Sequence, residues 1–316
     1  MRLLKQAGSV MTENDLKNLE EIRTFLEENN IKYSEALGNF CLFYDEQEER
    51  RMFEIEYVPS LEFPITYPKY GIEGVDKDYF YKKSIEALDN NSFKFWIKDF
   101  EWNHPRKREV MKSQIMHAYG ITPNKFYARD CVVREVGTQE GRAFEEENCF
   151  YGKRGASLTL GLYLKKDKNG FKKDTLLMLS SYGLNFFGKN SNTIEVIRVG
   201  TLRYSYVIGG SSKLLNHFIN NYKTIKIGKR IVCVEKIKFY SDLDHNAGTS
   251  LLDLGYELHS YSGGGFMNYW LETGEVKARE PARHSWVMNE IKEGRCRSIP
   301  NAGVGTYLLD TNKIKK

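Results

Sequence analysis

The sequence has no long apolar run, no closely spaced cysteine pair and no internal repeat. Because a transmembrane helix needs about 18 or more consecutive apolar residues, we expect no membrane span and no membrane partner. The N-terminus, MRLLKQAGSVMTEND, lacks the apolar stretch of a secretory signal. The five cysteines are scattered, which argues against a disulfide framework or a structural zinc site and favours a reducing, cytoplasmic compartment.

A strong charge of one sign is also lacking. The 47 lysines and arginines only slightly outnumber the 42 acidic residues, and the isoelectric point is near 8.7. Such a mild excess permits a nucleic-acid partner without requiring one, since most such excesses are solvated surface. Hydrophobic residues make up 41% of the chain, enough to bury a core, and the length of 316 residues predicts two domains. Nothing in the composition indicates an oligomeric state.

The first part of the chain predicts a small α/β domain. Thr12 and Asp15 form a variant capping box, which starts a helix whose apolar residues recur at helical spacing. Strands are predicted over residues 40–44, 53–57 and 93–100, and further helices over residues 79–88 and 106–119. The turn at residues 120–123 contains Gly and Pro, so we place a domain boundary there. The expected domains are residues 1–120 and 121–316.

The second part is richer in strands. They are predicted over residues 126–136, 158–164, 175–182 and 193–201, with a basic hairpin tip at Lys165–Lys173. A strand, a glycine turn, a helix, a second strand over residues 231–242 and a final helix then follow one another. Gly255 is predicted to end that final helix. This order is typical of a βαβα unit with a parallel pair of strands.

The glycine turn, Val207–Leu215 (VIGGSSKLL), has the pattern of an anion site. Two glycines let the backbone approach a ligand, and the next helix offers unpaired N–H groups and the positive end of its dipole. Lys213 would add a positive charge in the first turn of that helix. A tight strand-to-helix turn without a ligand explains the same residues equally well.

This order of elements resembles the acyl-CoA fold of the GNAT acyltransferases, whose glycine-rich loop binds the CoA pyrophosphate beside a splayed fifth strand. The family's helix motif is matched here by Asn246, Leu251, Leu254, Gly255 and Tyr256. Leu251 stands where many such enzymes have a general-acid tyrosine. The resemblance implies an α+β fold with a mixed, splayed sheet. It also implies acetyl-CoA or another acyl-CoA as cofactor, bound by Val207, Gly209, Gly210, Ser211, Ser212, Lys213 and Asn246.

A narrower resemblance is to bacteriophage proteins related to the Mom DNA-modification enzyme. Their motifs are matched, in order, by Tyr127–Arg129, Phe144, Asn148, Gly152, Glu195, Arg198, Val207–Leu215, Tyr240–Asp242 and Gly248. Cys149 stands where these relatives have a histidine. The resemblance implies a DNA-modifying enzyme of a phage, acting in the host cytoplasm, that attaches a small group to an adenine amine.

The N-terminal part resembles the Vsr-like homing-endonuclease module that precedes such domains. Residues 95–102 (FWIKDFEW), followed by residues 108–113, match its last strand and helix. A nuclease of this class needs acidic groups and a histidine or lysine around a divalent metal. Glu54, Glu56 and Glu62 lie upstream, but the sequence offers no complete set. We therefore expect no metal site and no nuclease, but a domain that docks or binds DNA.

Four residues near the second parallel strand are candidates for catalysis: Tyr240, Asp242, His245 and Arg198. Ligands of open α/β sheets bind at the carboxyl ends of strands, where three of these residues are expected. Asp242 could accept a proton, or could cap the next helix together with Asn246. His245 is of the residue type that exchanges protons near neutral pH, although many loop histidines are only exposed.

Two basic groups are candidates for binding nucleic acid: Lys172 and Lys173 in the hairpin tip, and Arg279, Arg283 and His284 near Trp286. We expect an acyltransferase-like protein that transfers a small acyl-derived group to an amine, with DNA adenine as the favoured acceptor. The alternative is an inactive phage-derived protein that retains both folds and docks to DNA or to a protein partner.

Overall fold

The computed structural model describes most of the 316 residues. The described ranges are residues 11–36, 39–42, 52–59, 63–66, 68, 73–184, 192–227, 230–278 and 285–313. Within them the chain is a mixture of helices and strands, which confirms the expected α+β class. Four residues named above, Glu62, Arg279, Arg283 and His284, lie outside the described residues.

The chain divides into two compact units, each built from separate stretches of sequence. The first unit comprises residues 1–105, 241–248 and 261–305. The second unit comprises residues 106–240, 249–260 and 306–316. The sequence-based division, by comparison, has a single boundary at residue 120. Stretches from the later part of the chain therefore complete the unit that the N-terminal residues begin.

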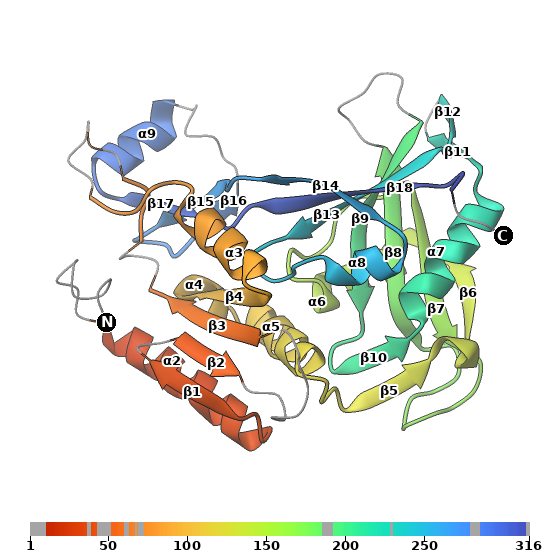
Figure 1. Cartoon of the computed structure of the whole chain (residues 1–316), viewed down its shortest axis with the longest axis horizontal. Coiled ribbons are helices and arrows are strands. Elements are labelled where there is room, and N and C mark those ends of the chain that lie inside the picture. Colours follow the sequence, from red (N-terminus) through yellow and green to blue (C-terminus); the bar gives the residue numbers. More distant parts are fainter. Residues whose placement is uncertain are drawn as a thin grey trace. The chain divides into compact units, whose positions relative to one another are not determined.

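A four-stranded sheet lies in the N-terminal part of the first unit (Figure 1). Its order is β1-β2-β3-β4, antiparallel except for the parallel pair β3 and β4. The strands are β1 (Tyr33–Ala36), β2 (Asn39–Leu42), β3 (Met52–Val58) and β4 (Ser92–Lys98). The helices are α2 (Glu13–Glu28), α3 (Tyr79–Asp89) and α4 (Asp99–Trp102). The strand expected over residues 93–100 is confirmed as β4, although α4 replaces its last two residues.

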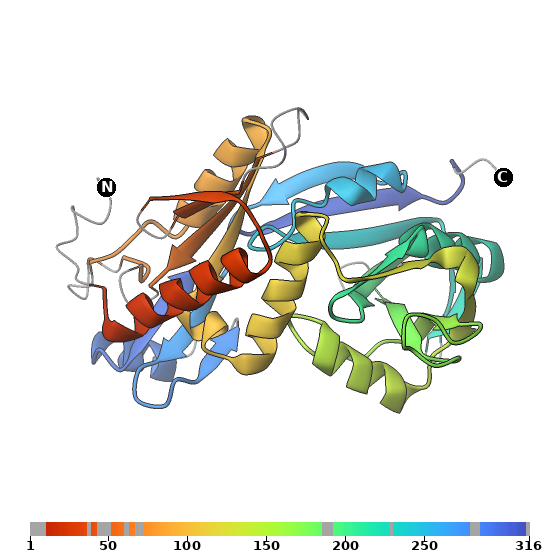
Figure 2. The same cartoon turned by 90° about the horizontal axis from the view of Figure 1, so that it is seen from below.

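Helix α2 begins as its capping box predicts. The Thr12 side chain accepts a hydrogen bond from the Asp15 backbone N–H, and the Asp15 side chain accepts one from the Thr12 backbone. Asp15 also accepts a hydrogen bond of 2.6 Å from the Tyr57 hydroxyl of β3. This buried contact fixes α2 to β3. Figure 2 shows α2, in red, beside the strands of this sheet.

The core of the first unit joins residues that are far apart in the sequence. The Trp96 ring lies 4.6 Å from the Phe80 ring, and its indole N–H donates to the Ser84 hydroxyl at 2.8 Å. Leu243 and Ala302, from the later stretches, are buried in the same cluster. Those stretches also carry a second sheet of order β16-β15-β17 and a helix. They are β15 (Phe266–Trp270), β16 (Val276–Ala278), α9 (Ser285–Lys292) and β17 (Cys296–Pro300).

A seven-stranded sheet forms the framework of the second unit, in the order β14-β18-β13-β9-β8-β7-β6. The first group of strands is β6 (Cys131–Glu135), β7 (Leu158–Leu164), β8 (Leu176–Leu184) and β9 (Thr193–Thr201). The remaining strands are β13 (Lys236–Asp242), β14 (Glu257–Ser262) and β18 (Val304–Asp310), and each of these also contributes residues to the first unit. Neighbours from β6 to β9 are antiparallel, whereas β9 and β13 are parallel, which confirms the expected parallel pair.

Smaller elements complete the second unit. The helices are α5 (Pro105–Ala118), α6 (Thr138–Asn148), α7 (Gly210–Asn221) and α8 (Thr249–Asp253). Two short parallel strands, β5 (Asn124–Tyr127) and β10 (Ser205–Ile208), form a separate pair, and β11 (Thr224–Ile227) pairs with β12 (Arg230–Cys233). Helix α7 lies across β6, β7 and β8 (Figure 1). Its Leu214 and Phe218 are buried in the main core.

Two expected strands are each divided in the structure. The strand predicted over residues 126–136 is β5 and β6, separated by the short 3₁₀ helix η3 (Ala128–Asp130). The strand predicted over residues 231–242 is β12 and β13. The final helix of the βαβα unit is confirmed as α8, and Gly255 follows it with a φ of 86°.

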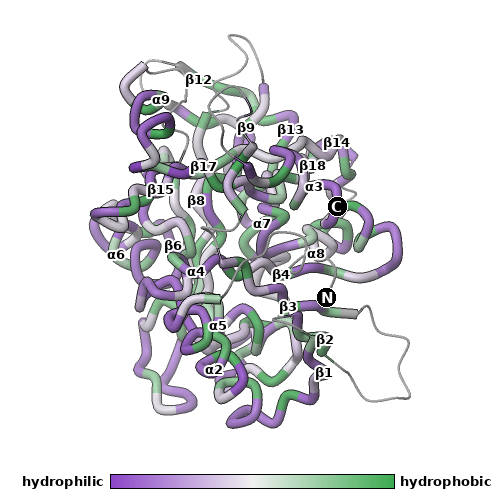
Figure 3. The backbone as a smooth tube through the Cα atoms, turned by 90° about the vertical axis from the view of Figure 1, so that its left-hand side faces the viewer, coloured by the Kyte–Doolittle hydropathy of each residue, from purple (hydrophilic) through white to green (hydrophobic). Residues whose placement is uncertain are grey.

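Hydrophobic residues are interspersed with hydrophilic ones along the trace in Figure 3. Among the described residues, no helix combines the length and the apolar character that crossing a membrane requires.

Candidate functional site

The parallel ladder between β9 and β13 covers only part of the two strands. It begins with the pair Thr193 and Lys236 and ends with the pair Val196 and Phe239. β9 nevertheless continues to Thr201, and there it still pairs with β8. The hydrogen-bonded pairing between β9 and β13 therefore stops partway along β9. The opposite edge of β9 remains paired with β8.

The predicted glycine turn lies directly after β10 and opens α7. Gly209 has a φ of 72°, a left-handed conformation that a residue without a side chain adopts easily. Ser211 and Ser212 are exposed in the first turn of α7, where backbone N–H groups have no acceptor within the helix. This turn has the local geometry of an anion site, because exposed N–H groups and the helix dipole point the same way.

Two residues predicted to bind the cofactor are packed rather than exposed. A Cβ atom on Gly210 would lie 2.8 Å from the Met178 sulfur and 3.1 Å from the Val207 Cβ atom. The Val207 side chain itself is buried in the main core. Gly210 is therefore required for packing beneath the turn, and Val207 could meet a ligand only through its backbone.

Lys213 is engaged with the protein backbone. Its ammonium donates hydrogen bonds of 2.7 Å to the carbonyl oxygens of Ala128 and Cys131. Burial lowers the pKa of Lys213, with the nearby Lys165 adding to the effect. Lys213 thus joins η3 to the N-terminus of α7 and places a positive charge there.

Asp242 and His245 are brought together in the first unit. The Asp242 Oδ2 atom lies 3.2 Å from Nδ1 of His245, and Oδ1 accepts a hydrogen bond from the Asp244 backbone N–H. The Asn246 side chain accepts a bond of 2.7 Å from the Gly248 backbone. Asp242 and Asn246 therefore shape the turns that follow β13.

A buried charge cluster that the sequence did not reveal lies behind this pair. The Lys98 ammonium is 2.8 Å from the Asp244 carboxylate and 4.0 Å from the Glu101 carboxylate. Asp244 also accepts a hydrogen bond from the Ala302 backbone. Burial opposes the charge on Lys98, but Asp244 and Glu101 together raise its pKa above the usual value. The cluster fixes residues 241–248 onto β4.

The other two candidates for catalysis, Arg198 and Tyr240, belong to the second unit. The Arg198 guanidinium donates to the carbonyl oxygens of Ile197, at 2.9 Å, and Gly152, at 3.4 Å. Burial lowers the pKa of Arg198. The Lys238 ammonium lies 4.6 Å from the centre of the Tyr240 ring. Both candidates follow the last paired residues of β9 and β13.

Cys149, at the position of the relatives' histidine, is buried beneath β9. A Cβ atom on Gly200 would come within 2.6 Å of its sulfur. Burial raises the pKa of this thiol to about 12, and the nearby Glu145 carboxylate adds to the rise. Glu145 is itself held by the Ser181 hydroxyl, which donates at 2.9 Å. A neutral, buried thiol of this kind contributes to the packing of side chains.

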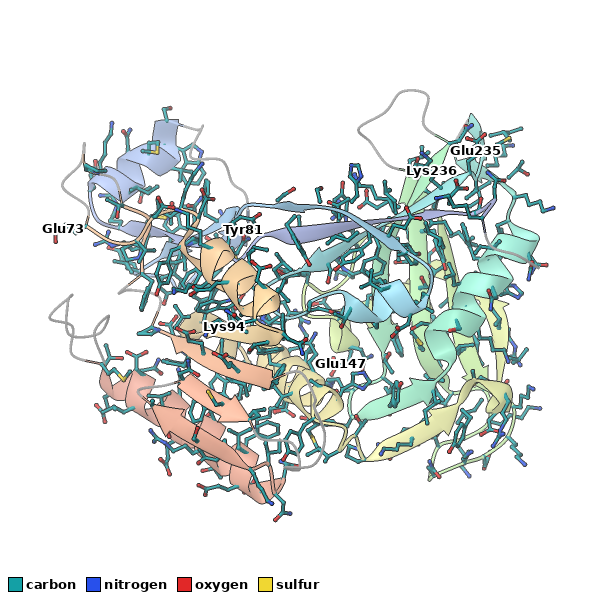
Figure 4. All side chains as sticks on the ribbon, viewed as in Figure 1. Glu73, Tyr81, Lys94, Glu147, Glu235 and Lys236 are labelled. Carbon is teal, nitrogen blue, oxygen red and sulfur yellow. The ribbon has the colours of Figure 1, made fainter. Side chains whose placement is uncertain are left out.

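The acidic residues of β3 share a lysine that sequence reasoning did not find. The Lys94 ammonium lies 2.5 Å from Glu54 and 3.0 Å from Glu56 (Figure 4). The Ser92 hydroxyl also donates to Glu54. Lys94 stands 40 positions from Glu54 and meets it only because β3 and β4 pair in register. Within the described ranges, no group of three or more His, Cys, Asp or Glu residues could hold a metal ion.

The basic hairpin tip is confirmed between β7 and β8, where Lys168 and Phe171 pair. Lys172 and Lys173 are exposed, as a nucleic-acid contact requires. Lys172 forms an ion pair of 3.1 Å with Asp167, so part of its charge is balanced locally. The second predicted basic group, Arg279, Arg283 and His284, lies outside the described residues.

A hollow of about 420 Å³ in the second unit is lined in part by Asn148 and by Phe171 of the hairpin tip. The Tyr204 hydroxyl donates to Glu109 at 2.5 Å, and the Asn148 side chain accepts from the Arg203 backbone. Its lining residues are Glu109, Glu147 (Figure 4), Asn148, Phe171, Leu202, Arg203 and Tyr204. The polar groups in this hollow are already bonded to one another.

The predicted residues thus form a glycine turn with Lys213 in the second unit and an Asp242–His245 pair in the first. The sequence identified both groups but not the buried charges that hold the pair. No protein-family model matches the chain, and no curated protein matches it in sequence.

Proposed function

We propose that this chain is an acyltransferase-like protein with a GNAT-like, Mom-related domain. It would bind acetyl-CoA or another acyl-CoA and transfer an acyl-derived group to an amine, with adenine in DNA as the favoured acceptor. The observation that carries the proposal is the partial ladder between β9 and β13, which ends at Val196 and Phe239. A parallel pair that separates beside a glycine turn and helix is the arrangement that the resemblance implies.

The order of the strands adds support. β6, β7, β8 and β9 follow one another in the sheet, and β13 lies beside the fourth of them. Helix α7, with its glycine turn, connects β9 to β13, as the family's pyrophosphate loop and helix would. One difference is β10, which intervenes between β9 and the turn and pairs with β5.

Several of the proposed residues then have a chemical task. The backbone N–H groups of Ser211 and Ser212 would hold the pyrophosphate, supported by the dipole of α7. An acyl-CoA supplies the activated thioester. The acceptor amine attacks its carbonyl carbon, the carbon–sulfur bond breaks, and the amine proton is lost to solvent. Tyr240 would donate its proton to the leaving thiolate, because Leu251 is buried and carries no acid.

A second candidate function has observations of its own in its favour. The Cys149 thiol is buried and neutral, the Lys213 ammonium is bonded to two carbonyls, and Lys94 neutralises Glu54 and Glu56. These features fit a phage-derived protein that has lost both chemistries and docks to DNA or to a protein partner. In either case we expect no nuclease activity from the N-terminal residues.

Calorimetric titration with acetyl-CoA and CoA separates the two functions. Ser211→Asp and Ser212→Asp each place a carboxylate in the first turn of α7, where the helix dipole stabilises it by about 0.3–1 kcal/mol. We expect both variants to unfold at a higher temperature than the parent and to lose CoA binding through repulsion of the phosphates.

Ser211→Ala and Ser212→Ala are the matched controls and should retain most of the affinity, since the backbone donates the hydrogen bonds. Gly210→Val is a poor probe, because its side chain would clash with Val207. No heat of binding in the parent, or full affinity in both aspartate variants, would reject the acyl-CoA site and favour the docking protein.

A further inference from the structure

The short pair β5 and β10 exposes aromatic residues on one face. In its register Tyr127 stands opposite Ile208, and Tyr206 stands opposite Lys125. Phe126 and Val207, between them, are buried, so alternation turns Tyr127, Tyr206 and Ile208 outward. Tyr127 is 42% exposed and Tyr206 is 39% exposed, which is unusual for residues in a paired strand.

Hydrogen bonds hold the basic hairpin tip beside these strands. The Lys165 ammonium donates to the Arg129 carbonyl at 2.8 Å, and the Asn169 side chain donates to the Lys125 carbonyl at 3.1 Å. Lys168 forms an ion pair with Asp130. These bonds join residues about 40 positions apart, so the tip and the aromatic face form one surface within the second unit.

Two positive charges lie over the ring of Tyr127. The Arg129 guanidinium carbon is 4.8 Å from the ring centre, and the Lys168 ammonium is 5.4 Å from it. We call this the basic-aromatic surface. Its members are Lys125, Tyr127, Arg129, Lys165, Lys168, Lys172, Lys173, Tyr206 and Ile208.

The segments that carry this surface have a local excess of positive charge. Residues 124–136 and 165–174, together with Lys213, contain nine lysines and arginines but only four acidic residues. The difference of five equals the formal net charge of the whole chain, +5. This local excess of positive charge would attract a polyanion to the surface.

The combination of charge and exposed rings favours one class of partner. A single strand of nucleic acid offers base faces that stack on tyrosine and phosphates that pair with lysine and arginine. A duplex hides its base faces, so it would use the charges alone. A protein partner would need a larger apolar area than Ile208 and two tyrosine rings supply.

We propose that the basic-aromatic surface binds single-stranded nucleic acid, with bases stacked on Tyr127 and Tyr206 and phosphates on the lysines of the hairpin tip. Binding of this kind goes beyond acyl transfer and needs no acyl-CoA at the turn. Ile208 is directly followed by Gly209, so the surface is continuous with the start of α7. A strand held here would also deliver unpaired bases to the proposed DNA-modifying domain.

The test is fluorescence anisotropy of the full chain with a labelled thymidine oligonucleotide of about 12 nucleotides, a length within the usual site size. We expect Tyr127→Ala and Tyr206→Ala each to weaken binding about tenfold, the usual effect of losing one stacked base. Tyr127→Phe and Tyr206→Phe should bind like the parent, because the ring remains. Tyr151→Ala, an exposed tyrosine elsewhere in the same unit, is the matched control and should have no effect.

The charge contribution is measured by salt dependence. Each phosphate contact on a single strand contributes about −0.7 to the slope of log affinity against log salt, so Lys172→Gln with Lys173→Gln should flatten the slope by roughly 1.4. Lys17→Gln with Lys82→Gln, two exposed lysines of the other unit, should leave it unchanged.

Three results would overturn the proposal. The first is no binding by the parent, and the second is parent affinity in both alanine variants. The third is displacement of the oligonucleotide by CoA, with loss of CoA binding in Tyr127→Ala, which would assign the surface to a nucleotide cofactor. Calorimetry with CoA on the same proteins keeps the outcomes distinct, since oligonucleotide binding without CoA binding rejects only the acyltransferase.

Discussion

Lys98 is fully buried, and the buried carboxylates of Asp244 and Glu101 compensate its charge. Taking an ammonium and a carboxylate out of water is costly, and their attraction offsets that cost only when both partners are present. Removing one partner therefore costs far more than the pair contributes as a whole. Here the partner, Asp244, is 146 positions away, so the pair also fixes one stretch of chain to another.

We predict that Lys98→Met lowers the free energy of unfolding by about 3–5 kcal/mol, because Asp244 would be left as an uncompensated buried charge. Chemical denaturation followed by tryptophan fluorescence measures the change. The double variant Lys98→Met with Asp244→Asn should recover part of the loss, since asparagine can still accept the bond from Ala302. A cost below about 1 kcal/mol in the single variant would mean that water reaches the pair.

Cysteine reactivity is a second prediction for single residues. With a pKa near 12 and only 6% of its surface exposed, Cys149 should resist alkylation in the folded protein near neutral pH, because only the thiolate reacts. The exposed Cys233 should react readily. Iodoacetamide labelling followed by peptide mass spectrometry compares the two sites. Rapid labelling of Cys149 would indicate a nucleophile after all.

Acid sensitivity is expected at Glu54. Burial acts to raise the pKa of this carboxyl, but Lys94 and Ser92 lower it below its ordinary value of 4.5. The folded chain then binds fewer protons than the unfolded chain just below that value. Glu54 therefore contributes stability above about pH 4.5, and this contribution is lost as the pH falls further.

Thermal unfolding between about pH 6 and pH 3 tests this expectation. The midpoint of Glu54→Gln should fall less steeply with acid than that of the parent. Glu28→Gln, an exposed glutamate of α2, is the control and should follow the parent curve. Parallel curves for the parent and Glu54→Gln would show that Lys94 does not favour the charged carboxylate.

At the scale of elements, the end of α8 is a pair of hydrogen bonds around one glycine. The Tyr256 N–H donates to the Leu251 carbonyl, and the Gly255 N–H donates to the Leu252 carbonyl, the pattern of a Schellman motif. A Cβ atom on Gly255 would meet only the Leu309 side chain, at an ordinary 3.6 Å. A substitution at Gly255 therefore tests the cost of the left-handed backbone conformation without a change in side-chain packing.

We predict that Gly255→Ala destabilises the chain by about 1–2 kcal/mol, the cost of a left-handed conformation for a residue with a side chain. Denaturant unfolding measures it. Gly274→Ala is the matched control. Gly274 also has a positive φ, 65°, and an added Cβ atom would meet open space, so this variant measures the backbone strain alone. No loss in either variant would mean that the backbone relaxes away from this conformation.

Elements with strong local signals could be predicted from the sequence. The capping box of Thr12 starts α2, alternation sets β9, and Gly255 ends α8. Helix α6 was not predicted, because its sequence, TQEGRAFEEEN, has few apolar residues to show a helical period. The break between β5 and β6 depends on Lys213, more than 80 positions away, which bonds the carbonyls around it. Contacts of that range leave no local pattern.

The same distinction between local patterns and long-range contacts applies to the candidate site. Glycines before an amphipathic helix, and an Asp and a His three positions apart, are local patterns, and the sequence identified both. Lys94 and Lys98 meet their carboxylates only through strand pairing and through a chain that returns from residue 244.

At the scale of the molecule, neither half of the sequence contains a complete unit. Leu243 and Ala302 are buried with Phe80 and Trp96 in the first unit. We predict that a fragment of residues 1–120 will not fold cooperatively, because its core lacks these residues and Lys98 lacks Asp244. Circular dichroism and thermal unfolding of the fragment test this. A sharp unfolding transition would show that residues 1–120 fold as an independent domain and do not need the later stretches.

The way the chain returns to its first unit has a consequence for biosynthesis. Residues up to 305 are needed to finish a unit that begins at the N-terminus, so about 200 residues must be translated after residue 105 before it can close. At a typical 5–20 residues per second, this delay is roughly 10–40 s. During that time apolar strands such as β3 and β4 have left the ribosome without their final partners. Chaperone demand in the cell should therefore fall on the nascent N-terminal segment.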